Sequence, residues 1–139
     1  MFGKNRKYIR MIETDNAKFH EFYGILLQWI KVHQSGHTLA DYFVKNGYKT
    51  VAIYGMKELG QALLKELVNS EVKVICGVDR DADSIFAAAD VYKPDEKLPD
   101  VDVMVITAVY YYTEIALYMA EKVKCPIVSL DDVVYEADL

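Results

Sequence analysis

The residues of this chain that are best suited to chemistry surround a short glycine-containing loop, GMKELG, at residues 55–60. An apolar run at residues 51–54 precedes the loop and a helical pattern follows it, so the sequence predicts a strand, a tight turn and a helix. Backbone N–H groups at such a helix start, together with the helix dipole, favour a phosphate group. Asp79 ends the next apolar run, 24 positions after Gly55 (79 minus 55), where dinucleotide-binding folds place the carboxylate that accepts the ribose hydroxyls. Gly60 is expected to let the helix pack closely on the strand.

Lys57 is the residue that departs from this fingerprint. The pattern G-x-G-x-x-G requires a glycine at its position, because that glycine lets the backbone approach the pyrophosphate. A side chain there obstructs the standard pose of a dinucleotide, although the ammonium group of Lys57 offers a positive charge to a phosphate. Two interpretations stay open: a loop that binds a phosphate ligand with the help of Lys57, and a vestigial loop in which Lys57 is merely solvated.

Further candidate residues lie after the predicted strand at residues 101–107, because open α/β sheets bind ligands beyond the carboxyl ends of their strands. Three consecutive tyrosines, residues 110–112, follow this strand. One or two of their rings are expected to stack on a base or to line a sugar pocket; the alternative is that they cover the sheet edge or a subunit contact. The predicted ligand-contacting residues are Gly55, Met56, Lys57, Glu58, Gly60, Asp79, Arg80, Thr107 and Tyr110.

Neither catalytic residues nor a metal site are expected. The sequence has no nucleophile elbow and no phosphate-binding P-loop. Tyr118 and Lys122 match the Tyr-x-x-x-Lys pair of short-chain dehydrogenases, but a chain with 11 tyrosines produces such a match by chance. His33 and His37 are four residues apart, but Gly36 interrupts the helix that would place them on one face.

The remaining apolar pattern predicts an α/β domain. Strands alternating with helices imply a three-layer, Rossmann-like fold with a mainly parallel five-stranded sheet in the order 3-2-1-4-5. Residues 93–100 leave no room for a crossover helix, so we expect this connection to cross the sheet without one. Strands are predicted at residues 51–54, 72–78, 91–92, 101–107 and 126–130, and helices at residues 59–68, 83–89 and 113–123, with a last turn from Asp131 to residue 134.

Residues 1–48 are predicted to be an N-terminal helical segment, and residues 49–139 the nucleotide-binding core. In residues 16–34, apolar residues recur at intervals of three and four, which predicts a helix with one apolar face. A sheet domain has its own helices to cover it, so this face either packs on the core or pairs with a second chain. We favour a homodimer through this helix with Trp29 near the centre of the interface. The face consists of Phe19, Phe22, Tyr23, Leu26, Trp29, Ile30 and His33.

Gly36 is expected to end this helix, and Thr38 to cap a second, short helix that Gly47 closes. Asp41 follows Thr38 by three residues, which is the spacing of a capping box.

Composition excludes several classes of protein. Of 139 residues, 53% are hydrophobic, which is incompatible with disorder, and no apolar run is long enough to span a membrane. The net charge of −5, without a basic stripe, argues against a nucleic-acid partner. Cys76 and Cys125 fall inside apolar runs, which indicates buried free thiols in a reducing, cytoplasmic environment. The N-terminal residues lack the pattern of a signal peptide.

Three segments carry a family resemblance: KTVAIYGMKELGQALLKELVNSEVKVICGVDRDADSI, LPDVDVMVITAVYYYTEI and CPIVSLDDVVYE. They resemble the Rossmann-like modules of bacterial surface-polysaccharide biosynthesis proteins, which precede sugar acyltransferase domains or accompany glycosyltransferases. The resemblance covers residues 34–136 and implies a site for a nucleotide sugar or related ligand at Gly55, Gly60 and Asp79. Such modules typically carry an intact glycine loop, from which Lys57 departs.

The sequence therefore predicts a non-catalytic module that binds a nucleotide, nucleotide sugar or related phosphate ligand in surface-polysaccharide biosynthesis. One alternative is a fragment of an NAD(P)-dependent oxidoreductase without its substrate domain, for which an NAD(P)-like cofactor is expected. A second alternative is a vestigial Rossmann domain that serves as a dimerisation module.

Overall fold

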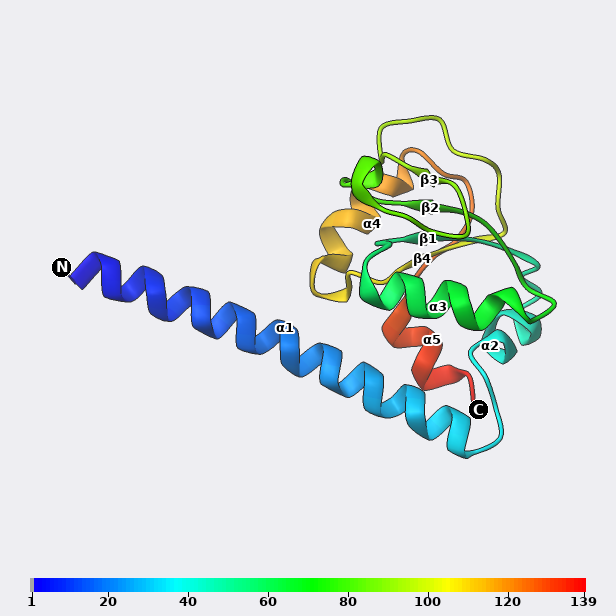
Figure 1. Cartoon of the computed structure of the whole chain (residues 1–139), viewed down its shortest axis with the longest axis horizontal. Coiled ribbons are helices and arrows are strands. Elements are labelled where there is room, and N and C mark those ends of the chain that lie inside the picture. Colours follow the sequence, from blue (N-terminus) through cyan, green and yellow to red (C-terminus); the bar gives the residue numbers. More distant parts are fainter. Residues whose placement is uncertain (1) are drawn as a thin grey trace.

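A five-stranded parallel sheet in the order β3-β2-β1-β4-β5 forms the centre of the fold (Figure 1). The computed structural model describes the backbone of residues 2–139 and the side chains of residues 5–139. All four strand pairs are parallel, so the predicted Rossmann-like α/β fold and its strand order are confirmed. The strands are β1 (Thr50–Tyr54), β2 (Lys73–Val78), β3 (Val91–Tyr92), β4 (Val103–Ile106) and β5 (Ile127–Ser129).

Alternate residues of the central strands face two separate hydrophobic clusters. Val51 and Ile53 of β1 belong to one cluster, whereas Ala52 and Tyr54 belong to the other. Because strand side chains alternate between the two faces and both faces are covered, these strands appear in the sequence as continuous apolar runs.

The helices are distributed unevenly over the two faces. α1 (Phe2–Gln34), α2 (Ala40–Lys45), α3 (Glu58–Val68) and α5 (Leu130–Glu136) contribute buried residues to the first cluster, and α4 (Tyr112–Ala120) contributes to the second. Leu98 and Val101, from the connection between β3 and β4, complete the cover of the second face. This connection contains no helix, as its length predicts.

The predicted helix at residues 83–89 is wrong. A single 3-10 turn, η1 (Ala82–Ser84), occupies this stretch, and Ile85 is already extended. The Ser84 hydroxyl donates to the carbonyl of Asp81 and closes the turn. Ile85, Ala87 and Ala89 pack against the first cluster, whereas Phe86 between them is 95% exposed. This alternation is that of an extended segment with one face on the core, which is why no helix forms here.

Two predicted helix caps also differ from the structure. Ser129, not Asp131, caps α5: its hydroxyl oxygen accepts the N–H of Asp132 at 3.1 Å. A serine ends β5 in extended conformation, which suits an N-cap better than a residue inside the first turn. At α2, the Asp41 carboxylate accepts the N–H of Thr38 at 3.1 Å, which is one half of the predicted capping box; the helix itself begins at Ala40.

α1 is longer than residues 16–34 and projects from the rest of the molecule (Figure 1). Only its C-terminal part is packed, where Ile25, Trp29 and Val32 are buried. Trp29 is 8% exposed and its indole N–H donates to the Glu66 carboxylate of α3 at 2.9 Å. The prediction that Trp29 centres a dimer interface is therefore wrong, because this residue lies in the core of its own chain. Among the helices of residues 2–139, none combines the length and the hydropathy that a membrane span requires.

Candidate functional site

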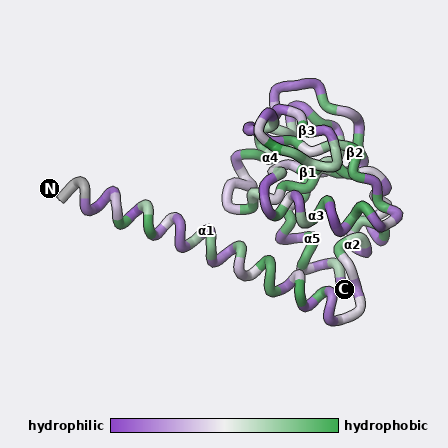
Figure 2. Tube along the Cα trace, viewed as in Figure 1, coloured by the Kyte–Doolittle hydropathy of each residue, from purple (hydrophilic) through white to green (hydrophobic). Residues whose placement is uncertain are grey.

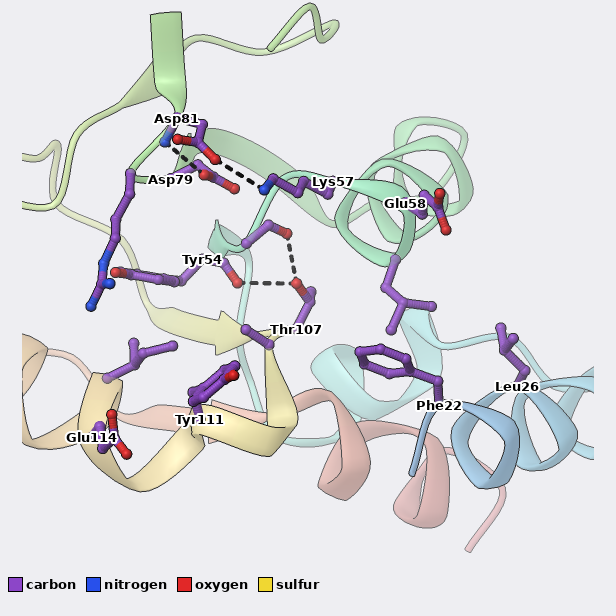
Figure 3. A pocket seen from close by; sticks show the side chains of 15 residues that line it. Phe22, Leu26, Tyr54, Lys57, Glu58, Asp79, Asp81, Thr107, Tyr111 and Glu114 are labelled. Carbon is purple, nitrogen blue, oxygen red and sulfur yellow. Dashed lines mark hydrogen bonds and ion pairs between the residues drawn. The ribbon is translucent and has the colours of Figure 1, made fainter. Parts of the chain in front are cut away.

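A pocket of about 750 Å³ lies where β1, β2 and β4 end, at the edge of the sheet that the sequence predicts for the site (Figure 3). Side chains from α1 close one side of it. The residues that line it are Phe22, Leu26, Tyr54, Gly55, Lys57, Glu58, Leu59, Asp79, Arg80, Asp81, Thr107, Ala108, Tyr111, Glu114 and Ile115.

Two glycines shape the loop that enters the pocket. Gly55 has a φ of +96°, and a Cβ atom there would lie 2.4 Å from the Thr107 hydroxyl. Gly60, in the first turn of α3, lies so close to the preceding turn that its Cβ would be 2.0 Å from the Gly55 carbonyl oxygen. The structure thus confirms the close packing of helix on strand that Gly60 was predicted to allow.

Met56 does not face the pocket. Its side chain is fully buried against Gly77, where a Cβ would lie 2.4 Å from the Met56 Cγ. Its backbone N–H donates to the Asp79 Oδ2 at 2.9 Å. Neither group of Met56 is left to contact a ligand.

Asp79 lines the pocket but uses both carboxylate oxygens within the protein. Oδ2 accepts the N–H of Met56, and Oδ1 accepts the N–H of Asp81 at 2.9 Å. Only 7% of the residue is exposed. In this arrangement Asp79 joins the end of β2 to the glycine loop, which is a different role from that of an acceptor for ribose hydroxyls.

Lys57 reaches across the mouth of the pocket to Asp81, and its Nζ lies 2.9 Å from the Asp81 Oδ2 (Figure 3). Both side chains are more than half exposed. The hydrogen bond and the charge of Asp81 raise the pKa of Lys57 above its ordinary value, so the ammonium group stays charged. A phosphate that uses Lys57 must compete with Asp81 for it.

Backbone N–H groups at the start of α3 are unpaired. Within the described part of the chain, no acceptor is found for the N–H groups of Lys57, Glu58 and Leu59, all of which line the pocket. The first bond that closes the helix is donated by Gln61 to the Lys57 carbonyl at 2.9 Å. Such unpaired donors, at the positive end of the helix dipole, are suited to an anionic group.

Thr107 and Tyr54 form the floor of the pocket at the ends of β4 and β1. The Thr107 hydroxyl donates to the Gly55 carbonyl at 2.6 Å and lies 3.2 Å from the Tyr54 carbonyl (Figure 3). Burial raises the pKa of Tyr54, and the guanidinium of Arg80 beside its hydroxyl opposes this shift. Tyr54 is therefore a neutral phenol near physiological pH, and Arg80 is its charged neighbour.

Of the tyrosines after β4, Tyr111 lines the pocket and Tyr110 does not. Their rings meet edge to face with centroids 5.1 Å apart. The ammonium of Lys18, on α1, lies 4.7 Å from the centre of the Tyr111 ring. The hydroxyl of Tyr111 is the main cause of a raised pKa at Lys18. The ring expected to contact a ligand is thus Tyr111, and Tyr110 packs beside it.

The charges around the pocket are unfavourable to a highly charged ligand. Four carboxylates line it, at Glu58, Asp79, Asp81 and Glu114, against two cations, at Lys57 and Arg80, which leaves a formal charge of −2 (2 minus 4). Among the described residues there is no cluster of three or more His, Cys, Asp or Glu side chains suited to a metal ion.

The structure thus brings Gly55, Lys57, Glu58, Asp79, Arg80 and Thr107 together at one pocket. Sequence reasoning did not assign Phe22, Leu26, Tyr54, Asp81 or Glu114 to this site. Tyr54 ends a predicted strand and was identifiable by that position, whereas no sequence signal places Phe22 and Leu26 of α1 beside the glycine loop.

Comparison with known proteins adds no relative: no family model, no curated protein and no solved structure matches the chain.

Proposed function

We propose that this chain is a non-catalytic binding module for a nucleotide or nucleotide sugar. The observation that carries the proposal is the set of unpaired N–H groups of Lys57, Glu58 and Leu59, which open into a pocket at the carboxyl edge of the sheet. A phosphate group of the ligand binds there, at the start of α3. The resemblance to surface-polysaccharide modules supports a nucleotide sugar.

The rest of the ligand occupies the space between α1 and α4. Tyr111 offers an aromatic ring, and Phe22, Leu26 and Ile115 offer apolar surface. Rings and apolar side chains of this kind suit a base, because every base has an aromatic face. The volume of about 750 Å³ is within the range of pockets for small organic ligands.

Binding requires an exchange of partners by Lys57. The ammonium leaves Asp81 and pairs with the phosphate, and the freed Asp81 carboxylate accepts a hydroxyl of the ligand. This scheme assigns to Asp81 the role that the sequence suggests for Asp79, whose oxygens are already bonded. It favours a ligand with few charges at the loop, since the pocket has more carboxylates than cations.

Calorimetric titration with nucleoside monophosphates, nucleotide sugars and NAD tests this function. Saturable binding of a nucleotide or nucleotide sugar is expected, with weaker binding of NAD. The Glu58→Lys variant, which adds a cation at an exposed position of the loop, is expected to tighten phosphate binding about fivefold, equivalent to roughly 1 kcal/mol. The matched control is Glu71→Lys, the same change of charge outside the pocket. If none of these compounds binds to the parent protein, the proposed function is overturned.

A further inference from the structure

The projecting part of α1 carries an apolar stripe that nothing in its own chain covers. Every described side chain from residue 5 to residue 13 is exposed, and the apolar ones continue toward the packed end of the helix. Figure 2 shows hydrophobic and hydrophilic residues alternating along this projecting length. The large apolar residues of the stripe, each between 41% and 67% exposed, are Ile9, Ile12, Phe19, Tyr23, Leu26 and Ile30.

These residues follow a seven-residue repeat. When Ile9 is placed at position a, apolar or aromatic residues occupy six of the eight a and d positions from Ile9 to the end of the helix. A strict heptad repeat is the pattern of a left-handed coiled coil, whereas a helix that packs on a globular core needs no such register. The a and d positions are Ile9, Ile12, Asn16, Phe19, Tyr23, Leu26, Ile30 and His33.

Asn16 is the polar residue within the apolar part of this stripe, and it stands at an a position. A single asparagine at a in a parallel coiled coil pairs with its counterpart across the seam and favours two strands in one register. At the flanking positions, Asp15 is a g residue and His20 is the e residue of the next heptad. In a parallel dimer these two meet across the seam and have complementary charge when the histidine is protonated.

Over most of its length the stripe is separate from the face that α1 buries within its own chain, which consists of Ile25, Trp29 and Val32. The two meet only toward the C-terminal end of the helix, where Leu26 also lines the pocket and the His33 Nε2 lies 2.6 Å from the Glu66 Oε1. At 3.6 residues per turn, the centre of the stripe lies roughly a third of a turn around the helix from the centre of the buried face. Two copies can therefore join along the stripe while their α/β domains lie outside the seam on opposite sides.

We propose that α1 forms a parallel two-stranded coiled coil with a second copy of this chain. The area agrees with what a stable dimer needs. Phe19 and Tyr23 are about two-thirds exposed and offer roughly 130 Å² each, because an aromatic side chain buries about 150–250 Å² when fully covered. The four aliphatic side chains are smaller and offer roughly 50 Å² each. Two chains therefore bury roughly 900 Å² in total, close to the roughly 1,000 Å² that a specific interface requires. Since an unpartnered helix is marginal in water, this pairing also explains how the projecting part stays helical.

A membrane surface is the other occupant that an exposed apolar helix face suggests, and Arg6, Lys7 and Arg10 near the start of α1 have the charge for it. The observations favour the second copy. Asn16 interrupts the apolar face that would enter the lipid, and the acidic Glu13 and Asp15 flank it.

Analytical ultracentrifugation of the full chain at micromolar concentration tests the proposal. The expected mass is that of a dimer, 31.8 kDa (2 × 15.9 kDa). Phe19→Asp is expected to yield monomers of unchanged α/β fold, since Phe19 is 67% exposed. Phe86→Asp is the matched control, because Phe86 is 95% exposed but lies outside α1, and it is expected to remain dimeric. A parent that sediments as a monomer overturns the proposal, as does a Phe19→Asp variant that remains a dimer.

Disulfide trapping tests the orientation. In a Cys125→Ser background, Asn16→Cys is expected to form an interchain disulfide in air, because a positions face each other only in a parallel pair. Glu21→Cys, at an f position on the outside of the helix, is the control and is expected to stay reduced. A dimer in which Asn16→Cys stays reduced overturns the parallel arrangement. Flotation with anionic vesicles tests the membrane alternative. A monomeric protein that binds these vesicles, and loses this binding in the Phe19→Asp variant, would overturn the dimer and assign the stripe to a membrane surface.

Discussion

The Asp79 Oδ2 accepts the N–H of Met56 at 2.9 Å, and this bond joins the end of β2 to the glycine loop after β1. The carboxylate is buried, and its second oxygen accepts the N–H of Asp81. A residue that in sequence has the position of a ribose acceptor is thus a support of the loop. The two roles are distinguishable by mutation: loss of a loop support lowers stability, whereas loss of a ribose acceptor lowers ligand affinity.

Asp79→Asn is expected to lower the free energy of unfolding by about 1–3 kcal/mol, because an amide has one acceptor oxygen and leaves a buried N–H without a partner. Urea unfolding measures this, with the exposed Asp95→Asn as a control that leaves stability unchanged. An Asp79→Asn protein of parental stability that has lost ligand affinity would show instead that the carboxylate serves the ligand.

Gly60→Ala is expected to destabilise the protein by about 2 kcal/mol or more, because the added methyl group meets the Gly55 carbonyl oxygen at 2.0 Å. Gly24→Ala is the matched control: it is also helical, but the nearest atom to its Cβ is 3.9 Å away. The control should gain roughly 0.5–1 kcal/mol from helix propensity. Thermal unfolding of both variants checks the opposite signs, and equal effects would contradict the packing that the glycine loop requires.

Lys57→Gly removes both an obstruction and a charge from the loop. We expect NAD to bind at least as tightly as to the parent, because the backbone becomes accessible to a pyrophosphate. A nucleoside monophosphate should bind less tightly, by roughly threefold, because the ammonium is lost. Titration of parent and variant with both ligands decides this. Weaker binding of both would mean that Lys57 obstructs nothing.

Glu66 holds α1 and the entry to α2 on α3, and its loss should loosen both. Its Oε1 accepts from Trp29 and lies 2.6 Å from the His33 Nε2, and its Oε2 accepts the N–H of Leu39 at 2.7 Å. Glu66→Ala is expected to lower the free energy of unfolding by about 2–4 kcal/mol, because two partly buried donors, the indole N–H of Trp29 and the backbone N–H of Leu39, lose their acceptor. The single tryptophan reports this change by fluorescence during urea unfolding. Glu71→Ala, on the exposed turn before β2, is the control; a Glu66→Ala protein as stable as this control would contradict the role.

The Asp102 carboxylate accepts hydrogen bonds at the start of β1, and this makes the stability of the protein depend on pH in the acid range. The N–H groups of Lys49 and Thr50 donate to its carboxylate and lower its pKa below the ordinary 3.8. Because the folded-state pKa is the lower one, the stabilisation is present above pH 3.8 and is lost as the pH falls through the folded-state value.

Asp102→Asn should therefore be less stable than the parent at neutral pH, and the difference should shrink below pH 3.8. Urea midpoints at several pH values measure it, with Asp100→Asn as the neighbouring control. A difference that does not change with pH would assign the effect to something other than this carboxylate.

The α/β class, the order of the five strands and the shape of the glycine loop were predictable from the sequence. These features depend on local pattern: apolar runs mark strands buried on both faces, and short connections between alternating strands and helices leave few topologies. Gly60 was predictable for the same reason, since only a glycine permits that close approach of helix and strand.

Only the tertiary structure decided which polar group satisfies which partner and which apolar face is covered. The Asp79 carboxylate accepts the backbone N–H of Met56, which follows another strand, and the Trp29 indole N–H donates to a carboxylate of α3. Neither hydrogen bond corresponds to a periodic pattern in the sequence. On α1, the residues at 25, 29 and 32 enter the core, whereas Phe19 and Tyr23 stay exposed, although all five belong to residue types that are commonly buried. Hydrophobic burial is non-directional, so the helix pattern predicts that a face is covered, and the geometry of docking selects which one.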